Sequence, residues 1–266
     1  MAEPTRRRGR PRSAPDASGT IQALDRALDI LDLLAGHPGL TLSEVAEKMD
    51  QSPSTVHRVL HTLAARGVAE TDPATQSWHI GPATFRLGSA FMRRSGIVER
   101  ARPILRALME HTGETANLGI LNGEAVLFLS QIETQETIRA FFPPGTRSPL
   151  HCSGIGKALL AFGPPATLEG LLRQVPLKRF TDRTLTTAEA LEEDMARIRH
   201  RGFAFDDEEK SRGMRCIAAP VFDFSGEAVA GISVSGPSHR IGHEHVKTLG
   251  AAVAAAAGDL SHALGA

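Results

Sequence analysis

The segment spanning residues 202–223, GFAFDDEEKSRGMRCIAAPVFD, constrains the fold more than any other part of the chain. Two short apolar runs flank a charged, glycine-containing stretch, which is typical of two antiparallel strands joined by a loop. In such a hairpin, Asp206 and Cys216 would face the same region from opposite sides of the loop. A carboxylate and a thiol placed in this way would form a small polar site on a sheet. The alternative is a buried hairpin in which Cys216 only fills space, as free cysteines usually do.

More strands and helices are predicted around this hairpin. Residues 115–121 and 126–132 flank Asn122-Gly123, a strong signal for a tight turn between two strands. The remaining predicted elements are strands at 137–142 and 227–235 and helices at 97–111, 157–162, 167–172, 187–201 and 242–264. Pro103 either kinks the first of these helices or marks its first turn. Antiparallel strands with helices before, between and after them indicate an α/β fold in which helices cover a sheet.

The N-terminal part has a different pattern. Apolar residues recur there at three- and four-residue spacing, which predicts a first helix. Its apolar stripe consists of Ile21, Leu24, Leu28, Leu31 and Leu34. A second helix begins at Thr41 or Leu42. Ser52 is a good N-cap and Pro53 a good first residue for a third helix, which Gly67 follows. Three short helices with a tight turn before the third predict a helix-turn-helix.

The third predicted helix presents polar side chains on the face opposite its apolar side. Such side chains read base edges and phosphates in the major groove of DNA. The candidate DNA-binding residues on this helix are Ser54, Thr55, His57, Arg58 and His61. Strands at 68–71 and 78–80 around a turn would add a wing. The spacing of His57 and His61 would also suit a metal pair, but no third ligand is nearby in the sequence. DNA contact is therefore the favoured role, and no metal site is predicted.

Residues 1–19 form a segment rich in arginine and proline, without the apolar periodicity that a folded core needs, and are predicted to be disordered. Within this tail, Arg8-Gly9-Arg10-Pro11 resembles an AT-hook, whose arginines enter the narrow minor groove of A·T-rich DNA. Arg8 and Arg10 are therefore candidate DNA-binding residues. The alternative is a solvated basic tail that is attracted to phosphates without sequence preference.

A short amphipathic segment separates the two patterns. The apolar residues on one side of this predicted linker helix are Phe85, Leu87, Phe91 and Met92. The sequence thus predicts a disordered tail at 1–19, a winged helix-turn-helix domain at 20–84, a linker helix at 85–96 and a second domain at 97–266. A chain of 266 residues is long enough for two modest domains, each with its own core.

Composition argues against several classes of protein. No window approaches the roughly 20 apolar residues that a membrane span needs, and the basic N-terminus lacks the apolar stretch of a secretory signal. A cytoplasmic location without a membrane partner is expected. Cys152 and Cys216 lie outside any CxxC motif, so reduced thiols are expected rather than a disulfide or a metal finger. No cofactor is predicted.

Both halves of the chain resemble the IclR family of bacterial transcriptional regulators. The segment TLSEVAEKMDQSPSTVHRVLHTLAARG is similar to the family's helix-turn-helix, WHIGPATFRLG to the exit from its wing, and residues 202–223 to its C-terminal signature. The resemblance implies a winged helix-turn-helix joined by a linker helix to a GAF-like α/β effector-binding domain. It also implies a homodimer or homotetramer that binds double-stranded operator DNA of a metabolic operon and responds to a small-molecule effector.

The residues and the resemblance together predict an effector site in the second domain. Ser153-Gly154-Ile155-Gly156 leads into a helix whose first backbone amides attract anions. Two serines alternate along the last strand, so that both hydroxyls point to one face. The candidate effector-binding residues are Gly154, Ile155, Asp206, Cys216, Ser233 and Ser235. No arginine aligns with these positions, so the expected effector is a small organic acid such as glyoxylate, with its oxo end toward Asp206 and Cys216. An aromatic acid is the alternative effector.

A cysteine-dependent enzyme is the competing function. Cys216 as a nucleophile would need a histidine base, and no motif places one beside it. The sequence also lacks a GxSxG elbow and a P-loop. A regulator is therefore the preferred interpretation, and no catalytic residue is predicted. A third class, an architectural DNA-binding protein without a ligand, would leave the polar residues of the second domain without a role.

Overall fold

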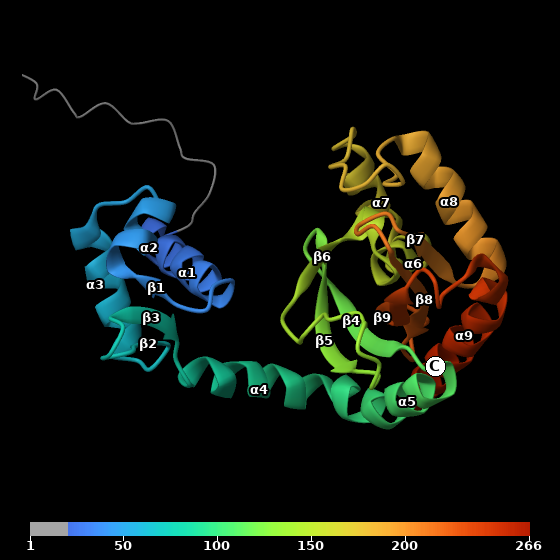
Figure 1. Ribbon diagram of the computed structural model, residues 1–266, viewed down its shortest axis with the longest axis horizontal. Coiled ribbons are helices and arrows are strands. Elements are labelled where there is room, and N and C mark those ends of the chain that lie inside the picture. The colour runs from blue at the N-terminus through green and yellow to red at the C-terminus, as the bar shows by residue number, and fades with distance from the viewer. Residues whose placement is uncertain (1–20) are drawn as a thin grey trace, which may run out of the picture. The chain divides into compact units, whose positions relative to one another are not determined.

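Helices and strands fall into two units along the chain, Met1–Arg93 and Arg94–Ala266 (Figure 1). The computed structural model describes residues 21–266, and for residues 92–95 the backbone alone. The predicted tail at 1–19, with Arg8 and Arg10, lies outside the described residues.

The predicted fold class is confirmed, because a helix-turn-helix unit is followed by a mixed α/β unit with a curled sheet. No helix in the described part of the chain has the length and apolar content of a membrane span.

The first unit is built on three helices, and local signals explain where they begin. These helices are α1 (Gln22–Ala35), α2 (Leu42–Lys48) and α3 (Pro53–Ala64). The hydroxyl of Thr41 accepts from the Glu44 amide and the Glu44 carboxylate accepts from the Thr41 amide, a capping box that starts α2. Ser52 caps α3 in the same position, and Pro53 supplies its first residue. The predicted helix-turn-helix is therefore present.

A small antiparallel sheet completes the first unit. Its strands are β1 (Leu40–Thr41), β2 (Ala69–Thr71) and β3 (Ser77–Ile80), in the order β1-β3-β2. Trp78 on β3 pairs with both Leu40 and Thr71 and is buried in the core of this unit with Val56 and Leu60 of α3. The sheet therefore holds the position of α3 from behind and leaves its other face to solvent.

The apolar stripe predicted for α1 divides between two environments. Leu34 of the predicted stripe is buried, together with Ile30, which was not part of it. Ile21, Leu24 and Leu28 remain 69%, 57% and 53% exposed. The next helix, α4 (Ala83–Ser95), also exposes large apolar side chains, with Phe85 at 80% and Leu87 at 58%. Within the single chain, part of the apolar surface of the first unit is thus left uncovered.

The second unit contains a six-stranded antiparallel sheet in the order β6-β5-β4-β9-β8-β7. The strands are β4 (Thr115–Asn122), β5 (Ala125–Ile132), β6 (Arg147–Pro149), β7 (Ala204–Asp207), β8 (Met214–Phe222) and β9 (Ala228–Pro237). Gly123 turns between β4 and β5 with a positive φ of 59°, as the Asn-Gly signal predicts. In the predicted hairpin of β7 and β8, Asp206 lies opposite Cys216.

Two groups of helices pack against this sheet. The first group is α6 (Gly154–Phe162), α7 (Pro165–Leu172) and α8 (Ala188–Arg201), which share one core with β5, β7 and β8. The second is the pair α5 (Ile97–Thr112) and α9 (Val246–Ala263), and α9 packs on β8. Pro103 lies inside α5. Short 3-10 turns, Leu150–Cys152 and His243–His245, precede α6 and α9.

One predicted strand is wrong. Residues 137–142 belong to an irregular segment between β5 and β6, and the strand that pairs with β5 is Arg147–Pro149 instead. Pro143 and Pro144 follow the predicted strand directly and have no amide to donate to a ladder, so pairing resumes only after them. Phe142 therefore lies outside the sheet, and its ring stacks on that of Phe128.

Candidate functional site

The exposed face of α3 carries the predicted DNA-binding side chains. Ser54, His57, Arg58 and His61 are exposed, whereas Thr55 is half-buried. Two of these residues also take part in the helix cap, because the Ser52 hydroxyl lies 3.1 Å from the Ser54 hydroxyl and 2.9 Å from that of Thr55. Arg58 is exposed and takes no part in this cap, so it is free to reach a base edge.

The two histidines of α3 pack on each other. The ring centroids of His57 and His61 are 4.2 Å apart, and the ring of His61 also meets Trp78 edge-on at 5.8 Å. No group of three or more potential metal-ligating side chains occurs among residues 21–266. The arrangement therefore orients the two rings on the helix surface, where they can contact DNA.

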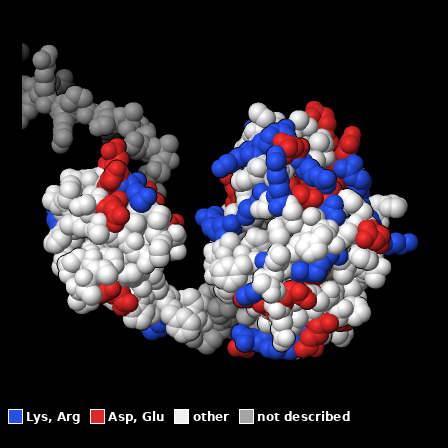
Figure 2. Space-filling model, in the orientation of Figure 1, with Lys and Arg blue, Asp and Glu red and all other residues white. Residues whose placement is uncertain are grey.

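Charge is distributed differently on the two units. Figure 2 shows few charged side chains on the visible face of the first unit, whereas acidic and basic side chains are interspersed over the second. The formal net charge of the whole chain is zero. The net charge of the chain therefore supplies no overall attraction to DNA.

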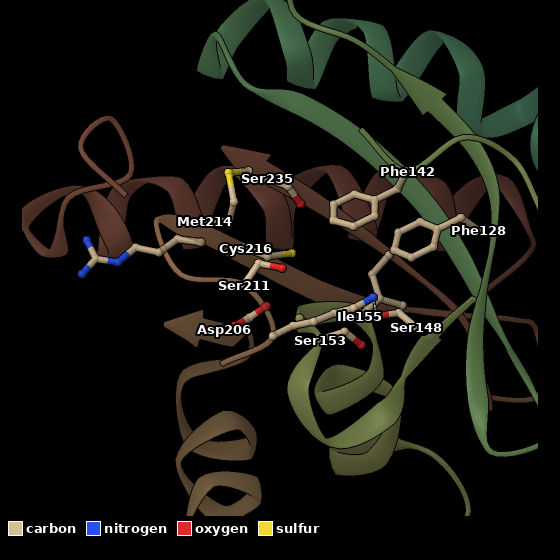
Figure 3. Close-up of a pocket in the computed structure, with 13 residues that line it drawn as sticks. Phe128, Phe142, Ser148, Ser153, Ile155, Asp206, Ser211, Met214, Cys216 and Ser235 are labelled. Carbon is tan, nitrogen blue, oxygen red and sulfur yellow. Dashed lines mark hydrogen bonds between the residues drawn. The ribbon is translucent and has the colours of Figure 1, made fainter. Parts of the chain in front are cut away.

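A small cavity in the second unit brings most of the predicted effector-binding residues together. Its volume is about 50 Å³, and its lining residues come from β5, β6, α6, β7, β8, β9 and two loops. The predicted residues that line it are Gly154, Ile155, Asp206, Cys216 and Ser235. In Figure 3, Asp206 and Cys216 lie on one side of the cavity, and the rings of Phe128 and Phe142 lie on the other.

The start of α6 approaches β8 closely at this cavity. A Cβ atom at position 154 would lie 2.7 Å from the sulfur of Cys216, so glycine is required there. The hydroxyl of Ser153 caps α6 by accepting from the Gly156 amide at 3.2 Å. The amide end of a nine-residue helix therefore borders the cavity, where it favours a negatively charged group.

Ser233 is absent from the lining of the cavity, although it lies on the same face of β9 as Ser235 and is fully buried. Asn117 on β4 connects the two serines, because its side-chain amide donates to the hydroxyls of Ser233 and Ser235 at 3.4 and 3.3 Å. Gln131 in turn donates to the Asn117 carbonyl at 3.2 Å. Asn117 was not predicted from the sequence. The available sequence signal was an amide side chain within the apolar run of β4, and in the structure Asn117 is fully buried.

Asp206 is a buried acid with few compensating charges. Its carboxylate accepts from the Glu209 amide at 2.8 Å. Burial, together with the negative charge of Glu209, raises the pKa of Asp206 to about 7. Below that pH the group is a neutral hydrogen-bond donor at the cavity wall, and above it the group is an anion.

Lys157 supplies the positive charge nearest to the acidic side chains on this side of the cavity, and it was also not predicted from the sequence. Its ammonium is fully buried, lies 2.9 Å from the Asp194 carboxylate, and donates to Glu209 and to the Phe205 carbonyl. Burial alone lowers the pKa of Lys157, but the acidic neighbours outweigh this effect and raise it. One ammonium thus serves three nearby carboxyl groups, because Asp206 also acts on it. A lysine inside the apolar run GIGKALLAF was the sequence signal.

Both cysteines are thiols rather than thiolates. Cys216 is partly exposed to the cavity, and its separation from bulk water raises its pKa to about 11. Burial raises the pKa of Cys152 to about 12. A nucleophilic cysteine requires the opposite shift. The Nε2 atom of His151 bonds to the Lys178 carbonyl at 2.9 Å.

Two cationic side chains, Lys210 and Arg215, line the cavity, whereas the sequence analysis placed no arginine there. Arg215 is paired with Asp207 at 2.7 Å and donates to the Ile241 carbonyl at 2.8 Å. Lys210 donates to the hydroxyl of Ser148 at 2.8 Å. Lys210 lies in the loop between β7 and β8, from which the sequence analysis named no candidate effector-binding residue.

Comparison with known proteins places this architecture in one family. Residues 23–73 match the IclR helix-turn-helix domain, and residues 89–262 match the domain described as bacterial transcriptional regulator IclR C-terminal. The HTH-type transcriptional regulator BhcR of Paracoccus denitrificans (strain Pd 1222) is 65% identical over 98% of this chain and 95% of its own length. The transcriptional repressor IclR of Escherichia coli (strain K12) is 37% identical over 94% of this chain and 92% of its own. The crystal structure of Thermotoga maritima IclR matches with a TM-score of 0.73 and 30% identity, over 92% of this chain and 99% of that one.

A helix-turn-helix unit with an exposed polar helix, followed by a unit with a small cavity that both apolar and polar side chains line, defines a ligand-responsive DNA-binding regulator. The chain belongs to the IclR family of bacterial transcriptional regulators. Its relatives are named as regulators, which confirms the prediction of a regulator rather than an enzyme.

Proposed function

We propose that this protein controls a metabolic operon in response to a small organic acid such as glyoxylate. The observation that carries the proposal is the size of the cavity, about 50 Å³, with five predicted effector-binding residues in its wall. A cavity needs at least roughly 10–15 Å³ to hold a single water molecule. The space therefore suits a ligand of a few heavy atoms, which is the size of glyoxylate or pyruvate.

A small oxo acid would find complementary groups at both of its ends. Its carboxylate would lie against the first amides of α6 and the Ser235 hydroxyl, and its oxo oxygen would face Asp206 and Cys216. Because the pKa of Asp206 is about 7, a protonated Asp206 can donate to the oxo oxygen instead of repelling the anion. Ser233, which bonds to Asn117 and Cys216, would keep these two side chains in place.

An aromatic acid is the second candidate effector, and one observation favours it. The stacked rings of Phe128 and Phe142 (centroids 5.1 Å apart), together with Ile155 and Met214, give the cavity an apolar end. A benzoate-sized ligand would have to displace Phe142. That residue lies in the irregular segment between β5 and β6, so its displacement would break no strand pairing.

Calorimetry with the full-length protein tests the choice of effector. We expect glyoxylate or pyruvate to bind wild type more tightly than benzoate, and Phe142→Ala to gain affinity for benzoate because the ring is removed. Cys216→Ser should weaken oxo-acid binding by ~1 kcal/mol, as for one neutral hydrogen bond. If benzoate binds wild type more tightly than either oxo acid, the proposed effector class is wrong.

We also propose that a homodimer binds the operator. Ile21, the N-cap of α1, forms an exposed apolar stripe with Leu24 and Leu28, and a second copy of the same helix would cover it. A two-fold dimer presents two α3 helices, which suits a pseudo-palindromic operator. Sedimentation should show that Leu24→Glu combined with Leu28→Glu dissociates the assembly. Phe224→Ser, which changes a similarly exposed residue of the second unit, is the control and should leave the dimer intact; dissociation by the control alone would refute this interface.

DNA recognition is assigned to α3 and to the N-terminal tail. Ser54, Thr55, His57, Arg58 and His61 are proposed to contact the major groove. Arg8 and Arg10 are proposed to contact the minor groove beside it. Deleting residues 2–12 should then reduce the slope of log affinity against log salt by about 0.9 for each phosphate that the tail neutralises; an unchanged slope would remove the tail from the interface.

A further inference from the structure

Lys210 occupies an unusual position in the second unit. It follows β7, one edge strand of the sheet, whereas its hydrogen-bond partner Ser148 lies on β6, the opposite edge strand. The 2.8 Å bond between them therefore joins the two edges of a six-stranded sheet across the cavity. The ammonium also lies 5.9 Å from the centre of the Phe142 ring, on the apolar side of the same cavity.

The other cations near the cavity already have carboxylate partners. Arg215 is paired with Asp207, and Lys157 with Asp194 and Glu209. Lys210 takes part in none of the ion pairs formed among the described residues. Its hydrogen-bond acceptor, Ser148, is neutral. Lys210 is thus the cation at this cavity that has charge left to offer a ligand.

We propose that Lys210 is the specificity-determining residue that recognises the carboxylate of the effector, exchanging the Ser148 hydroxyl for the ligand. This inference rests on the proposed function, and deepens it by naming the counter-charge. A buried carboxylate without a partner is strongly disfavoured. A carboxylate is also a better acceptor for an ammonium than a hydroxyl, because a hydrogen bond between two charged groups is stronger than one to a neutral group.

The exchange has a structural consequence. When Lys210 turns to the ligand, the direct bond between the two sheet edges is replaced by a bridge through the effector. The loop after β7 and the strand β6 then both respond to occupancy of the cavity. Lys210 distinguishes an acid from a neutral molecule of the same shape, while Asp206 and Cys216 face the oxo end that the two molecules share.

Calorimetry with pyruvate and its neutral amide, pyruvamide, tests the assignment. Wild type should bind pyruvate about tenfold or more tightly than pyruvamide, as expected for a hydrogen bond to a charged group. Lys210→Met keeps the aliphatic stem against Phe142 but lacks the ammonium, so this preference should disappear. Lys210→Arg should restore part of it. Ser148→Ala, which frees Lys210 from its present acceptor, should bind pyruvate at least as tightly as wild type.

Lys178→Met is the matched control. Lys178 also lies over an aromatic ring, that of Phe180 at 5.1 Å, but outside the cavity, so this variant should keep the preference of wild type. If wild type prefers pyruvate and Lys210→Met does so equally, the assignment of Lys210 is overturned while the effector class stands. If wild type binds neither molecule, nor glyoxylate, the effector class is itself wrong and the assignment fails with it. Circular dichroism of each variant establishes that the fold is retained.

Discussion

The two units present their functional groups in opposite ways. In the first, the side chains proposed to meet DNA stand on the outside of α3, and a small apolar core of Val56, Leu60 and Trp78 supports them from behind. In the second, the polar groups point inward around a cavity, and a fully buried Lys157 lies behind the wall. Reading DNA needs a rigid helix whose polar groups stay hydrated until contact. Holding a small anion away from water requires that every buried charge has a partner.

The largest effect on stability is expected when a buried charge loses its partner. Lys157→Met should destabilise the second unit by ~3–5 kcal/mol, the range for removing one partner of a buried ion pair, since Asp194 and Glu209 lose their counter-charge. Urea unfolding measures it. The single tryptophan, Trp78, reports on the first unit alone, so the circular dichroism transition should shift while the fluorescence transition stays. Adding Asp194→Asn and Glu209→Gln should recover part of the loss. Unchanged stability in Lys157→Met would show that the charge cluster is not needed.

The pH dependence of stability is the next expected effect. The pKa of Asp206 is about 7 in the fold against an ordinary value of 3.8, so the folded state binds the proton more tightly than the unfolded chain. The resulting stabilisation is complete below pH of about 4 and is lost as pH rises through 7. Several titratable groups act on Asp206, namely Glu209, Lys157, Asp207, Lys210, Cys152 and Cys216. The comparison with Asp206→Asn isolates the contribution of Asp206 itself.

Asp206→Asn keeps the acceptor for the Glu209 amide but does not titrate. Relative to wild type, it should therefore be more stable at pH of about 8.5 than at pH of about 5.5, as judged by urea midpoints at the two values. An equal difference at both pH values would mean that Asp206 is ionised throughout, and would contradict its proposed role as a donor to the oxo oxygen.

The exposed face of α3 should respond differently. Arg58→Ala should weaken binding to an operator fragment, selected from a random DNA pool, by roughly tenfold to a hundredfold, the range for one well-placed base contact. Both units should remain folded, and effector affinity should not change. Arg173→Ala, which removes an equally exposed charge at the end of α7, is the control for general electrostatics. Equal losses in the two variants, measured by fluorescence anisotropy, would argue that α3 does not read sequence.

The smallest expected effect separates two neighbouring serines. Ser235→Ala removes a hydroxyl from the cavity wall and should weaken oxo-acid binding by about 1.5 kcal/mol, as for a hydrogen bond to a charged group. Ser233→Ala removes a hydroxyl that does not line the cavity and leaves the bond from Asn117 to Ser235 in place, so its effect on binding should be smaller. Calorimetry that finds the reverse order would mean that Ser233, not Ser235, faces the ligand.

The difference between the units also explains what could be predicted from sequence. The DNA-binding face lies within a short run of consecutive residues, so helical spacing, Ser52 and Pro53 were enough to place it. The hairpin that opposes Asp206 to Cys216 was equally local, and its register follows from one loop. The strand predicted at 137–142 was wrong, and the strand that pairs there with β5 begins only after the two prolines that follow Phe142, which have no amide to donate to a ladder.

The remaining parts of the cavity depend on contacts between distant segments. Lys210 and Ser148 are 62 residues apart, and Asn117 and Ser235 are 118 apart. The curled sheet brings the two residues of each pair together, so no local sequence pattern could predict the contact. Lys157 and Asn117 could have been noticed as polar residues within apolar runs, but their partners could not have been named.

The most direct test is the affinity for operator DNA, measured by fluorescence anisotropy with and without saturating glyoxylate or pyruvate. A ligand-responsive regulator of small oxo acids predicts a shift of about fivefold or more in either direction, equivalent to a coupling free energy of at least ~1 kcal/mol. Lys210→Met should bind the same DNA but respond less to the acid. An operator affinity that is unaffected by either oxo acid, yet changes with benzoate, would contradict the proposal.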